Sequence, residues 1–238
     1  MNDIQNEFLS TVSHELRTPL TSIRGFSQTL LNSWEKLDEE SKKKFVKIIE
    51  EQSNRLINLV ENILTVSKIN VDKPLLRAVD VNVSIEKVVQ LLCQKYKGYK
   101  INFEPKLHLP CASLDEDKFQ QVMMNILENA CKYSEIGKTI TIITNYAESE
   151  RLMITVKDEG VGILQENLDK IFEKFVRLEN HLTSKTQGNG LGLYITKNLV
   201  ELMGGKIKVS SEIGVGTTFY LEFPFYNQEE VLKCSRQS

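Results

Sequence analysis

The chain has 238 residues and a formal net charge of −2 at pH 7, with 41% hydrophobic and 26% charged residues. That length is enough for two domains, and the composition is ordinary for a water-soluble globular protein. The small negative charge argues against nucleic acid and against an anionic membrane surface as main partners. Its purely apolar runs are only a few residues long, so we expect no direct membrane insertion by this chain.

The cysteines indicate the compartment. No C-x-x-C pair occurs among the four of them, Cys93, Cys111, Cys131 and Cys234. We therefore expect free thiols in a reducing compartment, with no metal site built on them. A cytoplasmic location meets this expectation.

The first periodic stretch runs from about Asp3 to Asn32. Its apolar residues recur at alternating steps of three and four, the spacing of a helix with a coiled-coil seam. This first seam consists of Leu9, Val12, Leu16, Pro19, Ile23, Phe26 and Leu30. Ser41 then looks like the N-cap of a second long helix. The second seam consists of Phe45, Ile49, Gln52, Leu56, Leu59, Ile63 and Val66.

Two helices with one narrow seam each cannot bury a core by themselves. We therefore expect residues 3–70 to form a helical hairpin that doubles into a four-helix bundle, which makes the protein a homodimer. Gln52 either fixes the register of the seam or is a tolerated imperfection. Pro19, which has no backbone N–H, should weaken or bend the first helix.

His14 is one of only three histidines and lies off the first seam. It shares the opposite face of the helix with Thr18, one turn further on. A histidine on the wet face of a bundle can be reached by a second molecule or domain, so this is a good position for a nucleophile. An incidental surface histidine is the commoner explanation of a lone residue, and the rest of the chain has to decide between the two.

Val71 to Asp80 contains Pro74 and loses the seam, which indicates a linker. Beyond it, helices alternate with short strands that show a period of two. We expect helices over 83–96, 115–133 and 191–203, and strands over 100–104, 138–145, 151–158, 206–210 and 217–223. Strands 138–145 and 151–158 form one hairpin and the last two strands another. The result is an α+β layer of helices on a mostly antiparallel sheet.

Three stretches of this second region carry residues suited to phosphate chemistry. The first, N-I-L-E-N-A-C-K-Y-S, starts at Asn125; its two asparagines share a helix face and can offer an oxygen to a hard cation and a donor to phosphate. The second, D-E-G-V-G-I, starts at Asp158 and puts a carboxylate at a strand end beside two glycines. The third, G-N-G-L-G-L, starts at Gly188 and opens a helix, whose N-terminus favours negative charge.

Each stretch also has a plain explanation when taken alone: polar residues near a helix end, a tight turn, or ordinary glycine turn chemistry. The third is not a dinucleotide fingerprint, because no strand directly precedes it, and it is not a P-loop, because no G-K-[ST] follows.

In order and spacing, the stretches resemble the motif boxes of the sensor histidine kinases of two-component systems. The resemblance covers residues from about 5 to 225. The H box is S-H-E-L-R-T-P around His14, and the N box and the two glycine boxes are the three stretches above. The F box is I-F-E-K-F from Ile171 to Phe175, and G-T-T-F from Gly216 to Phe219 closes the pattern. Six boxes in the family's order make chance agreement negligible.

The resemblance implies a multidomain fold of α and α+β type. Residues 1–70 would be the dimerisation and histidine phosphotransfer domain and residues 71–80 the linker. Residues 81–226 would be a catalytic ATP-binding α/β sandwich of the gyrase, Hsp90 and histidine kinase ATPase type. Residues 227–238 would be a C-terminal tail.

The resemblance also implies roles in binding ATP and Mg²⁺. Asp158 would accept a hydrogen bond from the adenine amino group, with Thr217 near the same edge and Tyr133 packed against the base. Asn129 would ligate Mg²⁺, while Asn125 and Lys132 would contact phosphate or metal-bound water. The other implied nucleotide-binding residues are Gly160, Gly162, Ile163, Arg177, Gly188, Gly190, Leu191, Gly192 and Leu193. Residues 176–190 would form a lid over the nucleotide.

The reaction implied is transfer of the γ-phosphoryl group of ATP to His14, with Glu15 as base or as orienter of the imidazole. The phosphoryl group would then pass to an aspartate in the receiver domain of a response regulator. The E-x-x-T element from Glu15 to Thr18 would also support dephosphorylation of that partner.

Related ATPases carry a glutamate at the position of Asn125, and an amide cannot replace it as the base that activates water. We therefore expect transfer rather than fast hydrolysis. Glu128 lies about 100° around the helix from Asn129, and we expect an ordinary surface glutamate.

Two other functions stay open at this point. One is a non-catalytic, dimeric nucleotide-binding scaffold, and the other is a protein that acts mainly as a regulator phosphatase. We expect a cytoplasmic catalytic core. It would either be part of a longer receptor, which could be anchored in the membrane, or be a naturally short soluble kinase by itself.

Overall fold

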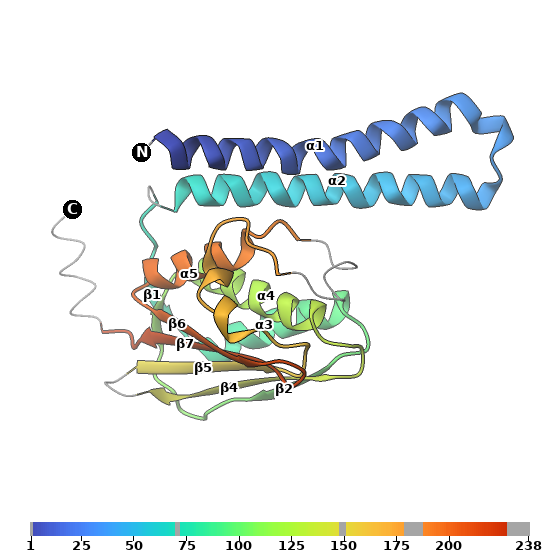
Figure 1. The fold of residues 1–238 in the computed structure, drawn as a ribbon. Coiled ribbons are helices and arrows are strands. Elements are labelled where there is room, and N and C mark those ends of the chain that lie inside the picture. Colours follow the sequence, from blue (N-terminus) through green and yellow to red (C-terminus); the bar gives the residue numbers. More distant parts are fainter. Residues whose placement is uncertain (1, 70–71, 148–150, 179–187, 228–238) are drawn as a thin grey trace. The chain divides into compact units, whose positions relative to one another are not determined.

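The structure is a computed structural model that describes residues 2–69, 72–147, 151–178 and 188–227, and the side chains from residue 10 onward. The chain forms two compact units, a first that spans residues 1–67 and a second that contains nearly everything from Lys68 onward. Figure 1 shows the first as a helical hairpin and the second as a sheet with helices. Within the described residues, no helix combines the length and the apolar character needed to cross a membrane.

The first unit is the predicted helical hairpin. Helix α1 (Asn2–Ser33) is joined to helix α2 (Glu39–Lys68) through the short 3-10 helix η1 (Trp34–Lys36). Pro19 and Leu30 of the first seam and Leu59 of the second are buried, and the rings of Phe26 and Phe45 meet at 5.2 Å. Leu9 of the first seam lies outside the described side chains.

Helix α2 begins earlier than predicted. The Oδ1 atom of Asp38 accepts a hydrogen bond from the backbone N–H of Ser41 at 2.7 Å, and the carbonyl of Asp38 accepts from the N–H of Lys42 at 3.0 Å. Asp38 is therefore the N-cap, and the prediction of Ser41 was wrong by three residues. The hydrogen bond from Ser41 also lowers the pKa of Asp38 below its ordinary value.

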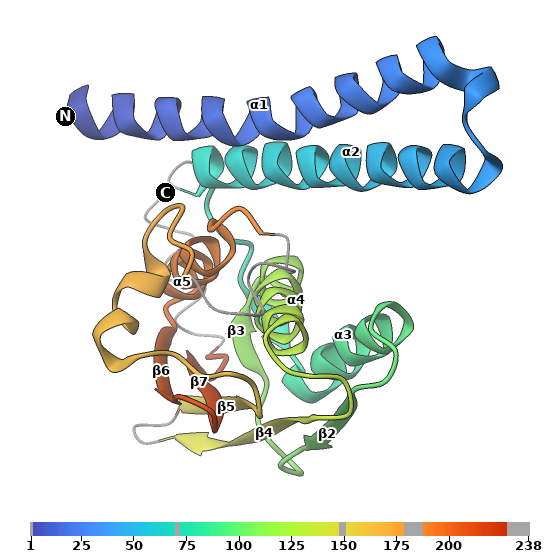
Figure 2. The same ribbon diagram turned by 45° about the vertical axis from the view of Figure 1, so that its right-hand side comes forward.

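Helix α1 continues through Pro19 without a break. Figures 1 and 2 show that the axis of α1 changes direction along its length. A proline inside a helix removes one backbone hydrogen bond and crowds the preceding turn, which is a common cause of such bending.

The second unit is built on a five-stranded sheet in the order β2-β4-β5-β7-β6. The strands are β2 (Lys100–Glu104), β4 (Thr139–Ala147), β5 (Arg151–Asp158), β6 (Lys206–Glu212) and β7 (Gly216–Pro224). Only β2 and β4 pair in parallel, and the other neighbours are antiparallel. The prediction of a mostly antiparallel sheet with two hairpins is confirmed.

Three helices cover one face of this sheet: α3 (Val81–Lys95), α4 (Glu116–Lys132) and α5 (Gly192–Leu202) (Figures 1 and 2). The core lies between the two layers, where every second residue of the central strands is buried, as their period of two predicts. Phe119 of α4 and Phe223 of β7 are fully buried and meet edge to face, with ring centroids 5.7 Å apart.

Two short strands, β1 (Arg77–Val79) and β3 (Ala112–Leu114), form an antiparallel pair that the sequence pattern did not predict. Asp115 follows β3 and caps α4 by accepting from the N–H of Lys118 at 3.3 Å. The same carboxylate accepts from the N–H of Leu75 at 3.0 Å. The segment that leads into β1 is thus tied to the start of α4.

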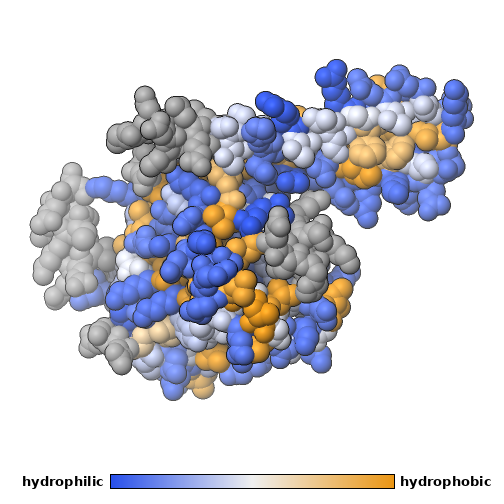
Figure 3. All heavy atoms as spheres, in the orientation of Figure 1, coloured by the Kyte–Doolittle hydropathy of each residue, from blue (hydrophilic) through white to orange (hydrophobic). Residues whose placement is uncertain are grey.

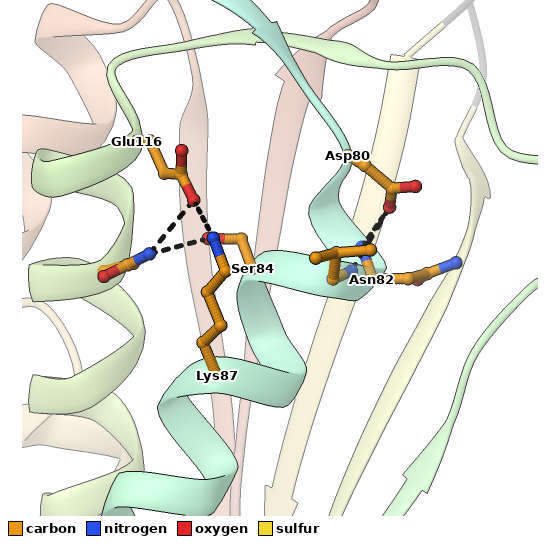
Figure 4. Close-up of polar contacts among 7 residues, drawn as sticks. Asp80, Asn82, Ser84, Lys87 and Glu116 are labelled. Carbon is orange, nitrogen blue, oxygen red and sulfur yellow. Dashed lines mark hydrogen bonds and ion pairs between the residues drawn. The ribbon is translucent and has the colours of Figure 1, made fainter.

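The packing of α3 on α4 also has polar contacts at its edge (Figure 4). Asp80 caps α3 and accepts from the N–H groups of Asn82 and Val83. Lys87 of α3 forms an ion pair with Glu116 of α4 at 2.8 Å. These contacts hold α4 in place, and α4 carries several of the predicted site residues.

Candidate functional site

The first predicted site residue, Asp158, is the last residue of β5 and is only 5% exposed. Its Oδ1 atom accepts hydrogen bonds from the backbone N–H of Gly160 at 2.8 Å and of Thr217 at 3.1 Å. Burial raises the pKa of Asp158 to about 6, although both hydrogen bonds act in the opposite direction. The result is a desolvated acceptor whose position is fixed by two separate loops.

Glycines make this close approach of the loops possible. A Cβ atom on Gly160 would overlap with the carbonyl oxygen of Tyr133 and come within 2.8 Å of Asp158 Oδ1. Gly216 has a φ of +134°, and a Cβ there would overlap with the carbonyl oxygen of Asp158. Gly162 has a φ of +73°, and a Cβ atom there would overlap with the carbonyl oxygen of Glu212. Any other residue at position 160 or 216 would push the backbone away from Asp158, and any other residue at position 162 would push it away from Glu212.

Hydroxyl groups complete this corner of the site. Ser211 Oγ lies 2.9 Å from Thr217 Oγ1, donates to the carbonyl of Gly216 at 2.8 Å and accepts from the N–H of Ile163 at 2.8 Å. Sequence reasoning missed Ser211, because a serine on a strand carries no motif signal. Ser134 is buried, and its Oγ has no hydrogen-bond partner among the described residues.

The end of α4 joins the same corner. The carbonyl of Tyr133 accepts from the N–H of Val161 at 3.0 Å, which ties the first glycine motif to the N-box helix. Tyr133 and Asn129 are both half-buried. Among the described residues no group of three or more His, Cys, Asp or Glu side chains could hold a metal ion. A cation here would have to be held by amide oxygens and by the ligand's own phosphates.

Asn125 brings the N-box helix against the second glycine motif. Its Nδ2 atom donates to Thr196 Oγ1 of α5 at 2.6 Å. A Cβ atom on Gly192, the first residue of α5, would lie 2.6 Å from Asn125 Oδ1. Leu191 before it is fully buried, and Leu193 is half-buried. The structure thus places two motifs that lie far apart in the chain side by side.

Glu128 is not the surface residue that was predicted, because its side chain is only 18% exposed. It lies between Lys95 of α3 at 2.6 Å and Lys132 of α4 at 3.3 Å. Burial alone would raise the pKa of Glu128, but the hydrogen bonds and charges of these two lysines outweigh it and lower that pKa. Lys132, predicted to contact phosphate, is therefore held by a carboxylate in this structure.

The residues at the two ends of the predicted lid, Phe175 and Gly190, lie next to each other. The N–H of Phe175 donates to the carbonyl of Gly190 at 3.0 Å, and both residues have a positive φ, 62° for Phe175 and 69° for Gly190. A Cβ atom on Gly190 would meet the backbone of Phe175 at 2.6 Å. Residues 179–187 of the lid lie outside the described residues, as does the tail from residue 228. Arg177 is exposed. A Cβ atom added to Gly188 would meet no described atom within 4 Å.

The remaining predicted residues lie in the first unit. His14 is exposed on α1, and Glu15 beside it pairs with Arg55 of α2, with Arg55 Nη2 3.2 Å from Glu15 Oε2. Thr18 is exposed, and its hydroxyl donates to the carbonyl of His14 at 3.3 Å. Arg55 was missed because nothing in its local sequence distinguishes it from other basic residues on a helix.

We expect the Asp158→Asn variant to change the pH dependence of stability. The folded-state pKa of Asp158, about 6, lies above that of an exposed aspartate, so the folded chain binds a proton first as the pH falls. Its stabilising contribution is full below about pH 4 and is lost as the pH rises through 6. Asparagine does not titrate, so the variant does not lose this contribution. The difference in free energy of unfolding, variant minus unmutated chain, should therefore increase by on the order of 2 kcal/mol between pH 4 and pH 7.5.

Urea unfolding followed by circular dichroism at several pH values measures this difference. Asp169→Asn is the matched control, because Asp169 is exposed and its substitution should give no such slope. A difference for Asp158→Asn that stays constant from pH 4 to pH 7.5 would contradict the assignment of a desolvated carboxylate.

Comparison with known proteins relates both units to described families. Residues 4–71 match the His Kinase A (phospho-acceptor) domain, and residues 114–227 match the histidine kinase-, DNA gyrase B- and HSP90-like ATPases. The chain is 35% identical over 237 residues to the sensor histidine kinase WalK of Bacillus subtilis, covering 97% of this chain and 38% of WalK. It is 32% identical over 233 residues to the sensor protein SrrB of Staphylococcus aureus, covering 94% of this chain and 39% of SrrB.

Solved structures agree in fold. Full-length ShkA in complex with AMPPNP is 30% identical, with a TM-score of 0.68 over 93% of this chain and 46% of that one. The Acinetobacter baumannii histidine kinase AdeS shares the fold at 24% identity and a TM-score of 0.69, over 90% of this chain and 98% of that one. The chain spans about two fifths of the length of the curated relatives it matches. A phospho-acceptor domain followed by an ATPase domain, in relatives that align with almost the whole chain, shows that it belongs to the sensor histidine kinases of two-component systems.

Proposed function

We propose that this chain binds ATP in its second unit and transfers the γ-phosphoryl group to His14 of its first unit. The observation that carries the proposal is the buried carboxylate of Asp158, whose Oδ1 atom already accepts from Gly160 and Thr217. The remaining lone pairs of the carboxylate suit the amino group of adenine, whereas guanine would present a carbonyl oxygen there and be repelled. ShkA, 30% identical, was solved with AMPPNP.

The other residues of the site fit the rest of such a ligand. The unpaired hydroxyl of Ser134 lies beside Asp158, within 3.0 Å of the position of a Cβ on Gly160. The start of α5, which lies against Asn125, is a favourable place for phosphate. Tyr133 follows the end of α4 and supplies an aromatic ring for the base.

The site also suits Mg²⁺ bound together with phosphate. Mg²⁺ in nucleotide sites takes one or two protein oxygens and completes its shell with phosphates and water. The amide oxygens of Asn129 and Asn125 would supply the protein ligand and a contact to metal-bound water. Bound there, Mg²⁺ would neutralise phosphate charge, while Lys132 would leave Glu128 for the phosphates.

His14 is suited to be the acceptor because it is exposed and because an imidazole can attack phosphorus through the lone pair of one ring nitrogen. In the transfer one ring nitrogen forms a bond to phosphorus, the bond to the β,γ-bridging oxygen breaks, and ADP leaves. Glu15 would take the proton from the other ring nitrogen or orient the ring for attack. In this structure the carboxylate is paired with Arg55 of α2, and it would have to part from Arg55 to act on the imidazole.

The amide of Asn125 cannot act as a base toward water, so the site favours transfer over hydrolysis. We propose that phosphorylated His14 then donates to an aspartate of a response-regulator receiver domain in the cytoplasm. Thr18 supports the reverse role, dephosphorylation of that regulator, because its hydroxyl lies one turn from His14. Named relatives of this chain are sensor proteins, which is consistent with a receiver domain as partner.

The first unit supports a homodimer. Large apolar residues of the hairpin are exposed to an unusual extent, namely Leu20, Leu31, Val46, Ile57, Val60 and Leu64. Figure 3 shows an apolar patch on the hairpin near the end where α1 and α2 are joined, bordered by hydrophilic side chains. Ile57, Val60 and Leu64 share one face of α2 at helical spacing. A second hairpin that covers this face would complete a four-helix bundle.

Labelling with γ-labelled ATP and Mg²⁺ tests the central proposal. The unmutated chain should acquire acid-labile, base-stable label, because a phosphoryl–nitrogen bond has those properties. His14→Gln should bind nucleotide but take up no label, and Asn129→Asp should lose label because the added negative charge repels the phosphates. Label retained by His14→Gln would refute His14 as the acceptor. A chain that binds ATP without any label would favour the scaffold or the phosphatase instead.

Thr18→Ala should reduce dephosphorylation of a phosphorylated receiver domain by on the order of 10²-fold and leave autophosphorylation of His14 nearly unchanged. Thr21→Ala is the matched control, since Thr21 makes the same kind of bond, donating to the carbonyl of Arg17 at 2.9 Å one turn further from His14. Dephosphorylation is measured as loss of label from the receiver domain, and autophosphorylation as gain of label on this chain. Equal loss of both activities in Thr18→Ala would count against the assigned role.

The Ile57→Lys/Leu64→Lys double variant should convert the dimer into a monomer of 27.3 kDa, because charged side chains would be buried in the bundle. Sedimentation equilibrium measures the mass directly. Leu107→Lys serves as control, because Leu107 is an equally apolar residue, 72% exposed, in the second unit. If the unmutated chain itself sediments as a monomer, the proposed dimer is wrong.

A further inference from the structure

The contact between Asn125 and Thr196 is the most specific polar link between α4 and α5. Thr196 lies on α5, one turn beyond Gly192, and is only 1% exposed. Its Oγ1 atom accepts from Asn125 Nδ2 at 2.6 Å. Seventy-one positions separate the two residues in the chain. Neither the family motifs nor the proposed reaction assign a role to Thr196.

We infer that Thr196 is a positioning residue that decides which end of the Asn125 amide faces the nucleotide and its bound Mg²⁺. The inference rests on the proposed function, in which Asn125 contacts phosphate or metal-bound water. It concerns the orientation of a side chain, so it goes beyond the claim that Asn125 takes part.

The two ends of an amide are not equivalent in such a site. The oxygen accepts hydrogen bonds and is attractive to a cation or its water, whereas the NH₂ group donates and would repel a cation. The structure places Oδ1 nearer to the start of α5 than Nδ2, since a Cβ on Gly192 would lie 2.6 Å from Oδ1 and 3.0 Å from Nδ2. Thr196 holds the nitrogen, and the oxygen is left for the ligand.

A threonine within a helix is suited to this task. Its hydroxyl proton commonly bonds to the carbonyl one turn back, which leaves the oxygen lone pairs free to accept. An accepting hydroxyl selects the NH₂ end of Asn125. Because Thr196 is buried, water cannot readily replace the hydroxyl, and without it the Nδ2 atom of the half-buried Asn125 would lose this partner.

A set of variants with nearly constant shape tests this. Thr196→Val keeps the volume and removes the acceptor, Thr196→Ser keeps the acceptor, and Asn125→Ala removes the amide. The full chain is titrated with AMPPNP in the presence of Mg²⁺ and, separately, with ADP in EDTA, and urea unfolding confirms that each variant folds. Thr196→Val should weaken Mg²⁺-dependent binding on the order of tenfold, Thr196→Ser should restore it, and binding of ADP in EDTA should change little.

The double variant Thr196→Val/Asn125→Ala separates positioning from a general packing effect. If Thr196 acts through the amide, adding Thr196→Val to Asn125→Ala should change the affinity no further. Independent, additive losses would overturn the inference, as would a Thr196→Val chain that binds like the unmutated one.

A second measurement does not depend on nucleotide. In a ¹⁵N-labelled chain, the side-chain amide protons of Asn125 should exchange slowly with solvent in the unmutated chain and in Thr196→Ser, and fast in Thr196→Val. Equal exchange in all three would refute the positioning role. If the unmutated chain bound no nucleotide but showed this exchange pattern, the proposed function would fail while the orientation of Asn125 by Thr196 would hold.

Discussion

The candidate nucleotide site of the second unit depends on the burial of one carboxylate at the end of β5. Removing Asp158 from water opposes its charge, and two backbone N–H groups offset only part of that cost. Both donors reach the carboxylate because Gly160 and Gly216 have no Cβ that would keep the loops apart. The glycines of these motifs are therefore needed for the backbone geometry around Asp158, and under the proposed function the desolvated carboxylate selects the adenine ring.

Under the proposed function, polar side chains on α4 extend the site from the base toward the phosphates. Asn125 is fixed by a neutral hydrogen bond to Thr196, whereas Lys132 is held by an ion pair with Glu128. The two arrangements differ in what a ligand must displace. The oxygen of Asn125 is already presented, but phosphate has to compete with a carboxylate for Lys132. Under the proposed function, Glu128 thus moderates the attraction of Lys132 for nucleotide.

The proposed acceptor, His14, lies on the hairpin in a different environment. His14 is exposed, and the side chains of Glu15 and Arg55 are 31% and 22% exposed. An ion pair so accessible to solvent contributes at most about 1 kcal/mol to stability. Its larger effect is geometric, because it links α1 to α2 beside His14. Under the proposed function, a link this weak allows Glu15 to part from Arg55 and act on the imidazole.

The sequence by itself determined the elements and the chemistry of the motifs, because hydrophobic period, caps and residue types are local properties. Prediction from the sequence failed in two places. Strands β1 and β3 are too short to show a period of two, and Asp38 and Ser41 are both residues that commonly cap a helix. The tertiary structure alone decided the partners, Thr196 for Asn125, Arg55 for Glu15 and Ser211 for Thr217. Contacts between residues far apart in the chain depend on how helices and strands pack, and no local pattern encodes them.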